Sequence, residues 1–465
     1  MINEDTICAI ATGQGGAIGI IRISGPEAIT ITNKIFCPAD KGSKPLTERK
    51  AYSIAYGHIK NENDEILDDV LVSLFRAPHS YTGEDCTEIS CHGSAYILQQ
   101  IMQVLVINGC RTAEPGEYTR RAFLNGKMDL SQAEAVADLI ASTSSATHKL
   151  AMNQMRGAFS HGLSELRDKL LHLTSLMELE LDFSDHEELE FADRTQLNDI
   201  AQQIENVVSQ LVSSFSLGNA IKRGVPVAII GETNAGKSTL LNTLVGEDRA
   251  IVSDIHGTTR DIIEDVVNID GIMFRFIDTA GIRETSDTIE RLGIDRTFKK
   301  IEQANIVIWV VDPTDKTGKT ELLSNQIFPL CKEKQLIIAF NKTDITGDAS
   351  LPDLNNPPTH IYSISISAKH GTNIDKLKNI LTNAAGIPTI ASSDVIVTNT
   401  RHYEALKRTL TTIRRVRESL TTNLPADLIS QDLRECIHNI AEIVGDEITS
   451  EETLQNIFKN FCIGK

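Results

Sequence analysis

One eight-residue stretch has the residue types and spacing of a phosphate-binding loop. Residues 231–238 read GETNAGKS, which fits the pattern G-x-x-x-x-G-K-[ST]. An apolar run at 225–230 precedes the loop, and residues 237–246 follow it with leucines at helical spacing. The backbone N–H groups of such a loop point at a polyphosphate, so we expect Lys237 to reach the β- and γ-phosphates and Ser238 to bind Mg²⁺. A chance match is the alternative, and the strand and helix around the motif argue against it.

Four short motifs follow the loop in chain order, and each has a use in a nucleotide site. Thr259, in the stretch HGTTRD, can complete a Mg²⁺ shell and sense a γ-phosphate. In the motif DTAG, Asp278 can hold that Mg²⁺ through water and the Gly281 N–H can bond the γ-phosphate. The other two motifs, NKTD at 341–344 and SAK at 367–369, each end a predicted strand.

The last two motifs select the base. Asp344 offers a carboxylate to the N1 and N2 donors of guanine, which adenine does not present. The Ala368 N–H can meet the guanine O6, while Asn341 and Lys342 pack around the base. All these motifs in this order predict a GTPase, and chance is a poor alternative.

A catalytic group common in small GTPases is missing. Many of them place a Gln directly after D-T-A-G to orient the attacking water, and this chain has Ile282 there. Glu284 is the nearest side chain able to polarise water, with a solvated switch residue as the alternative interpretation. Asn234, inside the phosphate loop, offers a neutral oxygen that could hold a monovalent cation near the β- and γ-phosphates. Such an ion would supply the positive charge that an arginine finger otherwise provides.

Composition excludes several classes of protein. The chain has 465 residues, a formal net charge of −18 and 41% hydrophobic residues, typical of a globular chain of about three domains. The net charge means that any RNA contact must use local basic patches. Eight scattered cysteines without a C-x-x-C pair fit a reducing, cytoplasmic compartment. No basic signal peptide begins the chain and no apolar run approaches a membrane span, so we expect no membrane association.

The N-terminal quarter reads as an α+β unit. We expect strands at 6–11, 18–24, 51–60, 68–76 and 85–91, and helices at 26–36 and 96–107. The glycine cluster at 13–16 does not fit G-x-G-x-x-G, and a hairpin turn is its simpler interpretation. The segment 115–127, PGEYTRRAFLNGK, is dense in basic residues, which by themselves more often indicate a solvated face than a ligand site.

Helical periodicity fills two separated segments. Residues 130–217 are helical up to an acidic break at 185–190, and the pattern resumes near 399. Between the two segments, Asp270-Gly271 joins two strand-like runs, 262–269 and 272–277, in a predicted hairpin. The basic helix 401–417 suits RNA, or is simply a solvated face. We therefore predict a multidomain α/β chain: an N-terminal α+β domain (1–125) and a helical domain (126–219 and 386–465) interrupted by a Ras-like P-loop GTPase domain (220–385).

The whole chain resembles the tRNA modification GTPase MnmE (TrmE) family. The resemblance lies in GETNAGKS, SDIHGTTRD, DTAGIRE and NKTD, in the N-terminal ATGQGGAIGIIRISG, SYTGED and PGEYTRRAFLNGKMDLSQAEAVADLI, and in the terminal FCIGK. It implies a homodimer formed by an N-terminal domain that binds a 5-formyl-tetrahydrofolate-type cofactor. It further implies a K⁺-activated GTPase that acts with the FAD-containing partner MnmG (GidA), as a heterotetramer, on the wobble uridine (position 34) of certain tRNAs. The group installed at C5 is aminomethyl or carboxymethylaminomethyl.

Site residues carried over from the resemblance follow the motifs. Asn234, Ser253, Ile255 and Thr258 match the K⁺ ligands, Ser238 and Thr259 the Mg²⁺ ligands, and Glu284 the catalytic glutamate. Arg22, Glu84, Lys127 and Lys465 match the folate contacts, and the role of Cys462 is left open. The full set of expected GTP contacts is Asn234, Ala235, Gly236, Lys237, Ser238, Thr239, Ser253, Asp254, Ile255, His256, Gly257, Thr258, Thr259, Asp278, Thr279, Ala280, Gly281, Asn341, Lys342, Asp344, Ser367, Ala368 and Lys369.

Two residues depart from the family pattern. Glu232 adds negative charge near a phosphate, and His256 replaces a small residue in the K⁺ loop.

Two other functions compete with the one that the resemblance implies. One is an RNA-binding GTPase switch in ribosome assembly, and the other is a conformational switch for partner proteins. Folate binding discriminates among the three, because only the tRNA-modifying function predicts it.

Overall fold

A computed structural model describes most of the chain. The described residues are 5–13, 15–40, 42–182, 194–247, 265–277, 300–314, 319–346, 361–387, 395–422, 424–445, 454, 457–459, 461 and 464. They fall into two compact units: Met1–Ile140 with Gln154–Asp193 and Thr422–Lys465, and Ala141–Asn153 with Arg194–Thr421. The domain boundaries given above remain a prediction.

The second unit contains a mainly parallel six-stranded sheet in the order β13-β12-β11-β8-β10-β9. Its central strands β8, β11 and β12 have nearly continuous apolar sequences, as expected for strands covered on both faces. Only β9, at the edge, is antiparallel, and it pairs with β10. The strands are β8 (Val225–Ile230), β9 (Asp265–Ile269), β10 (Ile272–Phe276), β11 (Ile306–Val311), β12 (Gln335–Phe340) and β13 (Ile361–Ser365).

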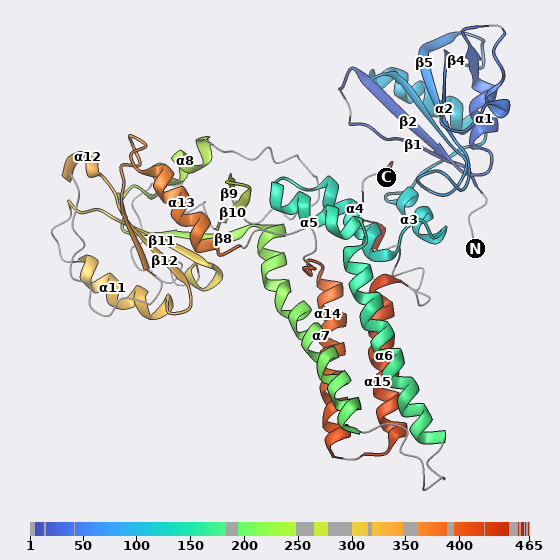
Figure 1. Cartoon of the computed structure of the whole chain (residues 1–465). Coiled ribbons are helices and arrows are strands. Elements are labelled where there is room, and N and C mark those ends of the chain that lie inside the picture. Colours follow the sequence, from blue (N-terminus) through green and yellow to red (C-terminus); the bar gives the residue numbers. More distant parts are fainter. Residues whose placement is uncertain are drawn as a thin grey trace. The chain divides into compact units, whose positions relative to one another are not determined.

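Helices cover both faces of this sheet (Figure 1). On one face, α8 (Lys237–Glu247) and α13 (Ile374–Ala385) bury their leucines against alternate side chains of β8 and β11. On the other, α11 (Lys319–Leu330) packs Phe328 edge-on to Trp309 of β11. A short helix, α12 (Thr343–Thr346), follows β12. Because both faces are covered, the carboxyl ends of the parallel strands are left as the place where a ligand can bind.

The predicted Asp-Gly hairpin is confirmed. Strands β9 and β10 pair in antiparallel register from Ile272 opposite Ile269. Asp270 has φ 51° and Gly271 has φ 83°, the left-handed pair that a two-residue type I′ turn requires.

The first unit contains a seven-stranded sheet in the order β3-β4-β5-β6-β2-β1-β7. Its strands are β1 (Ile7–Ile10), β2 (Ile18–Ser24), β3 (Phe36–Pro38), β4 (Ser53–Lys60), β5 (Ile66–Phe75), β6 (Cys86–His92) and β7 (Arg111–Thr112). The core lies between one face of this sheet and two helices, α1 (Ala28–Ile35) and α2 (Ala95–Ile107). A 3-10 turn, η1 (Leu46–Glu48), contributes Leu46 to this core. The antiparallel pairing of β1 with β2 confirms the hairpin expected at the glycine cluster.

Long helices build the rest of each unit. In the first unit, α6 (Ala158–Asp182) packs along α15 (Ala426–Val444), near α3 (Glu117–Leu124) and α4 (Leu130–Ile140). In the second, α7 (Arg194–Arg223) packs along α14 (Thr400–Thr421) (Figure 1). Helix α5 (Ser145–Met155) precedes α6. Within the described part of the chain, no helix is both long and apolar enough to cross a membrane.

The interpretation of residues 115–127 as a solvated face is wrong. Five residues of α3 are buried, among them Glu117, Tyr118 and Arg121. Their charges are buried because they neutralise each other: Arg121 donates to Glu117 at 3.0 Å and to Asp5 at 2.6 Å, and Arg111 donates to Glu117 at 2.6 Å. Mutual pairing, which a sequence of mixed charges does not reveal, removes the cost of burying each charge alone.

Candidate functional site

The phosphate loop has a backbone shape that only glycine permits at two positions. Gly231 has φ 144°, and a Cβ there would lie 2.3 Å from the Val310 carbonyl oxygen. Gly236 has φ 101°, and its Cβ would lie 2.1 Å from Asn341 Nδ2. The two glycines therefore let the loop pass directly against β11 and against the NKTD segment. This close approach shapes the loop into a narrow cradle at the end of β8.

Lys237 lies inside this cradle. Its Nζ donates to the carbonyl oxygens of Gly231 at 2.8 Å and of Glu232 at 2.5 Å. Burial, followed by the neighbouring charge of Lys300, lowers the pKa of Lys237. A polyphosphate would offer this ammonium a stronger acceptor than two carbonyl groups do, so the geometry fits the predicted role of Lys237.

Asn341 joins the phosphate loop to the SAK segment. Its Nδ2 donates to the Ala235 carbonyl at 2.8 Å, and its Oδ1 accepts from the Ala368 N–H at 2.9 Å. A further link comes from Thr243 of α8, whose hydroxyl donates to the Ala368 carbonyl at 2.9 Å. The parallel register of β8, β11 and β12 brings these segments to the same edge of the sheet.

Asp344 is oriented by its neighbours. Ser367 Oγ donates to Oδ1 of Asp344 at 2.6 Å, and His370 Nε2 lies 3.6 Å from Oδ2. The Ser367 hydrogen bond, opposed by slight desolvation, is the main reason why the pKa of Asp344 is lowered. Asp344 is therefore ionised at neutral pH, as an acceptor for two N–H donors of a guanine must be.

The structure brings together the described members of the predicted GTP site: 234–239, Asn341, Lys342, Asp344 and 367–369. Asn234 has φ 66°, a left-handed conformation in the middle of the loop. The other predicted members lie outside the described residues. These are Ser253, Asp254, Ile255, His256, Gly257, Thr258, Thr259, Asp278, Thr279, Ala280, Gly281 and Glu284, together with Ile282.

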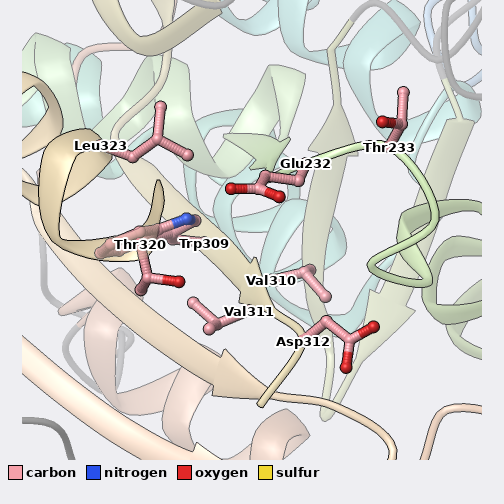
Figure 2. A pocket seen from close by; sticks show the side chains of 8 residues that line it. All are labelled: Glu232, Thr233, Trp309, Val310, Val311, Asp312, Thr320 and Leu323. Atoms are coloured by element: carbon pink, nitrogen blue, oxygen red, sulfur yellow. The ribbon is translucent and has the colours of Figure 1, made fainter. Parts of the chain in front are cut away.

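A small pocket adjoins the phosphate loop. Glu232 and Thr233 of the loop line it together with the end of β11 and two side chains of α11, Thr320 and Leu323 (Figure 2). Asp312, at its rim, also pairs with Lys342 of the NKTD motif. The sequence reasoning missed Asp312. It directly follows the apolar strand β11, just as Asn341 follows β12, and that position was the available signal.

Arg22, predicted to contact folate, lies in an aromatic and charged setting on β2. Its guanidinium carbon is 5.6 Å from the ring centre of Tyr81 and 5.7 Å from that of Tyr118. Its Nη2 is 2.8 Å from Glu88, and its Nη1 donates to the Gly464 carbonyl at 3.4 Å. The C-terminal Gly464 thus reaches the N-terminal sheet, where a Cβ on it would lie 2.5 Å from the Ile10 carbonyl oxygen.

Glu84 and Lys127 lie close together. Glu84 accepts from Ser24 Oγ at 2.7 Å and from Arg121 Nη1 at 3.1 Å. Lys127 donates to the Pro78 carbonyl at 2.9 Å, and its stem lies beside Gly83, the neighbour of Glu84. Charged donors and acceptors with aromatic faces suit a folate, which has a hydrogen-bonding pterin and a carboxylate tail. Lys465, the fourth predicted contact, and Cys462 lie outside the described residues.

A glycine-containing loop that leads from β8 into Lys237, beside an aspartate at the end of a neighbouring parallel strand, is the arrangement of a P-loop GTPase. Comparison with known proteins then identifies the family to which this chain belongs. Residues 130–462 match the MnmE helical domain family, and residues 6–127 match the family GTP-binding protein TrmE N-terminus. The tRNA modification GTPase MnmE of Bacteroides thetaiotaomicron is 63% identical over 469 residues, with 100% of both chains covered. The chain belongs to the tRNA modification GTPase MnmE family.

Other relatives agree with this placement. The Flavobacterium johnsoniae protein of the same description is 51% identical over 471 residues, again covering 100% of both chains. A crystal structure of a variant of Aquifex aeolicus Era bound to GDP·AlF₄⁻ is 29% identical over 40% of this chain and 66% of that chain, with a TM-score of 0.26. A TM-score this low carries no weight in the assignment.

Proposed function

We propose that this K⁺-activated GTPase acts with the FAD-containing partner MnmG in a heterotetramer that modifies C5 of the wobble uridine, position 34, of certain tRNAs. The group installed is aminomethyl or carboxymethylaminomethyl. The observation that supports this proposal most directly is the guanine-reading Asp344 held beside the phosphate cradle. The test is mass spectrometry of tRNA nucleosides from cells lacking the protein. Unmodified wobble uridines support the proposal, and unchanged modification levels contradict it.

The potassium part of the proposal rests on Asn234. Its position in the loop places an amide oxygen among the backbone groups that would face a nucleotide, and amide oxygens are hard ligands suited to K⁺. We propose Ser253, Ile255 and Thr258 as its other ligands, and Ser238 with Thr259 as Mg²⁺ ligands. A cation there would supply the charge that an arginine finger supplies elsewhere, a factor of about 10³–10⁵ in rate.

The potassium requirement and the role of Glu284 are testable with two salts and two variants. GTP hydrolysis in KCl should far exceed that in NaCl for the native chain, and Asn234→Ala should lose most of the difference. Glu284→Ala should lower turnover while leaving GDP affinity nearly unchanged, since its proposed role is to orient water. Equal hydrolysis in the two salts would exclude the cation mechanism without touching GTP binding.

The homodimer proposal is supported by an exposed apolar face of the N-terminal sheet. Ile54 and Tyr56 of β4 and Leu71 of β5 are 65%, 56% and 45% exposed, and Tyr56 pairs directly opposite Leu71. Apolar side chains gathered on one sheet face are what a second copy would cover. Sedimentation equilibrium should show a dimer that Leu71→Asp weakens, and a wild-type monomer would contradict the proposal.

The folate proposal rests on Arg22, Glu84 and Lys127, with Lys465 as the fourth contact. Calorimetric titration with 5-formyl-tetrahydrofolate should show binding that Arg22→Ala and Lys127→Ala weaken. Binding unchanged in both variants would contradict this assignment. In the ribosome-assembly alternative, two of the basic residues of α14, Arg414 and Arg417, are already paired with Glu205 of α7.

A further inference from the structure

Asp312 and Lys342 face each other across two neighbouring strands. Strands β11 and β12 run parallel with Val311 opposite Phe340, so the residues that follow them leave the same edge of the sheet side by side. Lys342 Nζ donates to Oδ2 of Asp312. The second oxygen, Oδ1, accepts from the Thr314 N–H at 3.0 Å and from Thr314 Oγ1 at 2.7 Å. Both oxygens of Asp312 are therefore engaged, one by its own loop and one by Lys342.

The pair is partly shielded from water and carries opposite charges. The Asp312 side chain is 17% exposed and that of Lys342 is 31% exposed. Burial alone would raise the pKa of Asp312, but hydrogen bonds from Lys342 and Thr314 outweigh it and lower that pKa. The Asp312 carboxylate is therefore ionised at neutral pH and can hold the Lys342 ammonium group.

A lysine whose ammonium group is already held loses less conformational entropy on ligand binding than a lysine whose side chain moves freely. The four-carbon stem of Lys has large rotamer freedom, which disappears when it packs against a ligand. Lys342 also has φ 65°, so its backbone is held in the left-handed region beside Asn341. With the backbone set by the loop and the ammonium set by Asp312, the stem between them is ordered before any ligand arrives, which is a gain in preorganisation.

We propose that Asp312 is a positioning residue for guanine nucleotides, which fixes the stem of Lys342 where it packs against the face of the base. Asp312 acts through Lys342 alone and does not touch the nucleotide. This role depends on the GTP site described above. A base-face contact is indifferent to the groups on the edge of the base, so Asp312 governs affinity but not the choice between guanine and hypoxanthine.

A purely structural role is the competing explanation, because Asp312 also lines the pocket beside Glu232 and Thr233 (Figure 2). Loss of a structural residue would weaken binding whether or not Lys342 is present. A role through Lys342 predicts instead that the Asp312 effect vanishes once Lys342 is replaced. A double-mutant cycle separates the two explanations.

The experiment measures GDP and inosine diphosphate affinity by calorimetry for the full chain, Asp312→Asn, Lys342→Met and the double variant. Asparagine keeps an oxygen for Thr314 and replaces the charged acceptor of Lys342 by a neutral amide NH₂ group. We expect Asp312→Asn to bind both nucleotides about threefold to tenfold more weakly, by the same factor. The double variant should bind no more weakly than Lys342→Met.

One control variant and one rescue variant complete the design. Thr314→Val, which leaves the Lys342 contact in place, should bind GDP within about twofold of the native chain. Asp312→Glu restores the charge and should recover part of the affinity. Asp312→Ala replaces Asp312→Asn as the uncharged variant if the asparagine variant unfolds at a lower temperature. Native affinity in Asp312→Asn, or additive losses in the double variant, would overturn the proposal. A native chain that fails to bind GDP would instead refute the GTP site itself.

Discussion

The side-chain amide of Asn341 donates a hydrogen bond to the Ala235 carbonyl at 2.8 Å, although 106 residues separate them in the chain. The oxygen of the same amide accepts from the Ala368 N–H at 2.9 Å. One side chain, 4% exposed, thus holds the phosphate loop and the SAK segment in a fixed relation. The segment proposed to bind phosphate and the segments proposed to read guanine therefore depend on each other through Asn341.

Replacing Asn341 by Ala should therefore weaken GTP and GDP binding together. Both hydrogen bonds are lost and the Ala235 carbonyl and Ala368 N–H are left unpaired, so we expect a loss of about tenfold to a hundredfold in affinity. Calorimetry with GDP checks this. Thr243→Val removes the link to the Ala368 carbonyl, together with a hydrogen bond to the Thr239 carbonyl within α8. It is the matched control and should cost much less. Equal losses of GDP affinity in the two variants would contradict the role of Asn341 in joining the two segments.

Gly464→Ala should detach the end of the chain from the N-terminal sheet. Gly464 has φ 94°, and the new Cβ would meet the Ile10 carbonyl oxygen at 2.5 Å and Ala11 Cα at 3.1 Å, neither of which can move easily. Strain of this kind costs about 1–3 kcal/mol. We expect weaker 5-formyl-tetrahydrofolate binding as well, because the carbonyl of Gly464 contacts Arg22. Urea denaturation measures the loss of stability, and calorimetric titration measures the loss of folate affinity. Gly13→Ala, whose added Cβ would meet no atom within 4 Å, is the neutral control for both measurements.

The buried ion cluster around Glu117 should make stability depend on acid pH. Burial alone would raise the pKa of Glu117, but Arg111, the Glu114 N–H and Arg121 outweigh it, so the folded pKa lies below the ordinary value of 4.5. A carboxylate with a lowered pKa contributes stability that is fully present above 4.5 and is lost as pH falls through the folded pKa. Glu117→Gln should cost about 3 kcal/mol at pH 7, because it leaves the buried Arg121 and the partly exposed Arg111 short of a partner.

Urea denaturation at several pH values measures this effect. The difference between the native chain and Glu117→Gln should stay constant from neutral pH down to about 5 and then shrink, since the native carboxyl itself becomes protonated. Glu165→Gln is the control, because Glu165 is largely exposed beside His161 and should cost less than about 0.5 kcal/mol. A difference that does not change on acidification would contradict the linkage.

Burial should protect three cysteines from alkylation. It raises the pKa of Cys86 to about 12 and the pKa values of Cys91 and Cys331 to about 11. Only the thiolate reacts, so iodoacetamide at pH 8 should leave these three unmodified while the half-buried Cys37 is labelled. Peptide mass spectrometry gives the labelled fraction at each site, with guanidine-unfolded protein as the fully reactive reference. Labelling of Cys86 as fast as Cys37 would contradict the burial argument.

The local elements were predictable because their causes are local. The Asp270-Gly271 turn, the strand from Val225 to Ile230 and the loop glycines each follow from a residue's own backbone preferences or from hydrophobic periodicity. The GTPase class was predictable for a related reason, because GETNAGKS and NKTD are short local patterns whose residue types and spacing suit a guanine nucleotide.

What the tertiary structure decided were the partners. The pairing of Asp312 with Lys342 depends on β11 lying between β8 and β12, and that strand order has no signature in either segment alone. The burial of Glu117 and Arg121 likewise depends on Asp5 and Glu84 arriving from distant parts of the chain. A charged side chain looks the same in a sequence whether it faces water or an opposite charge, so the sequence determined the chemistry available, and only the fold determined which charges neutralise each other.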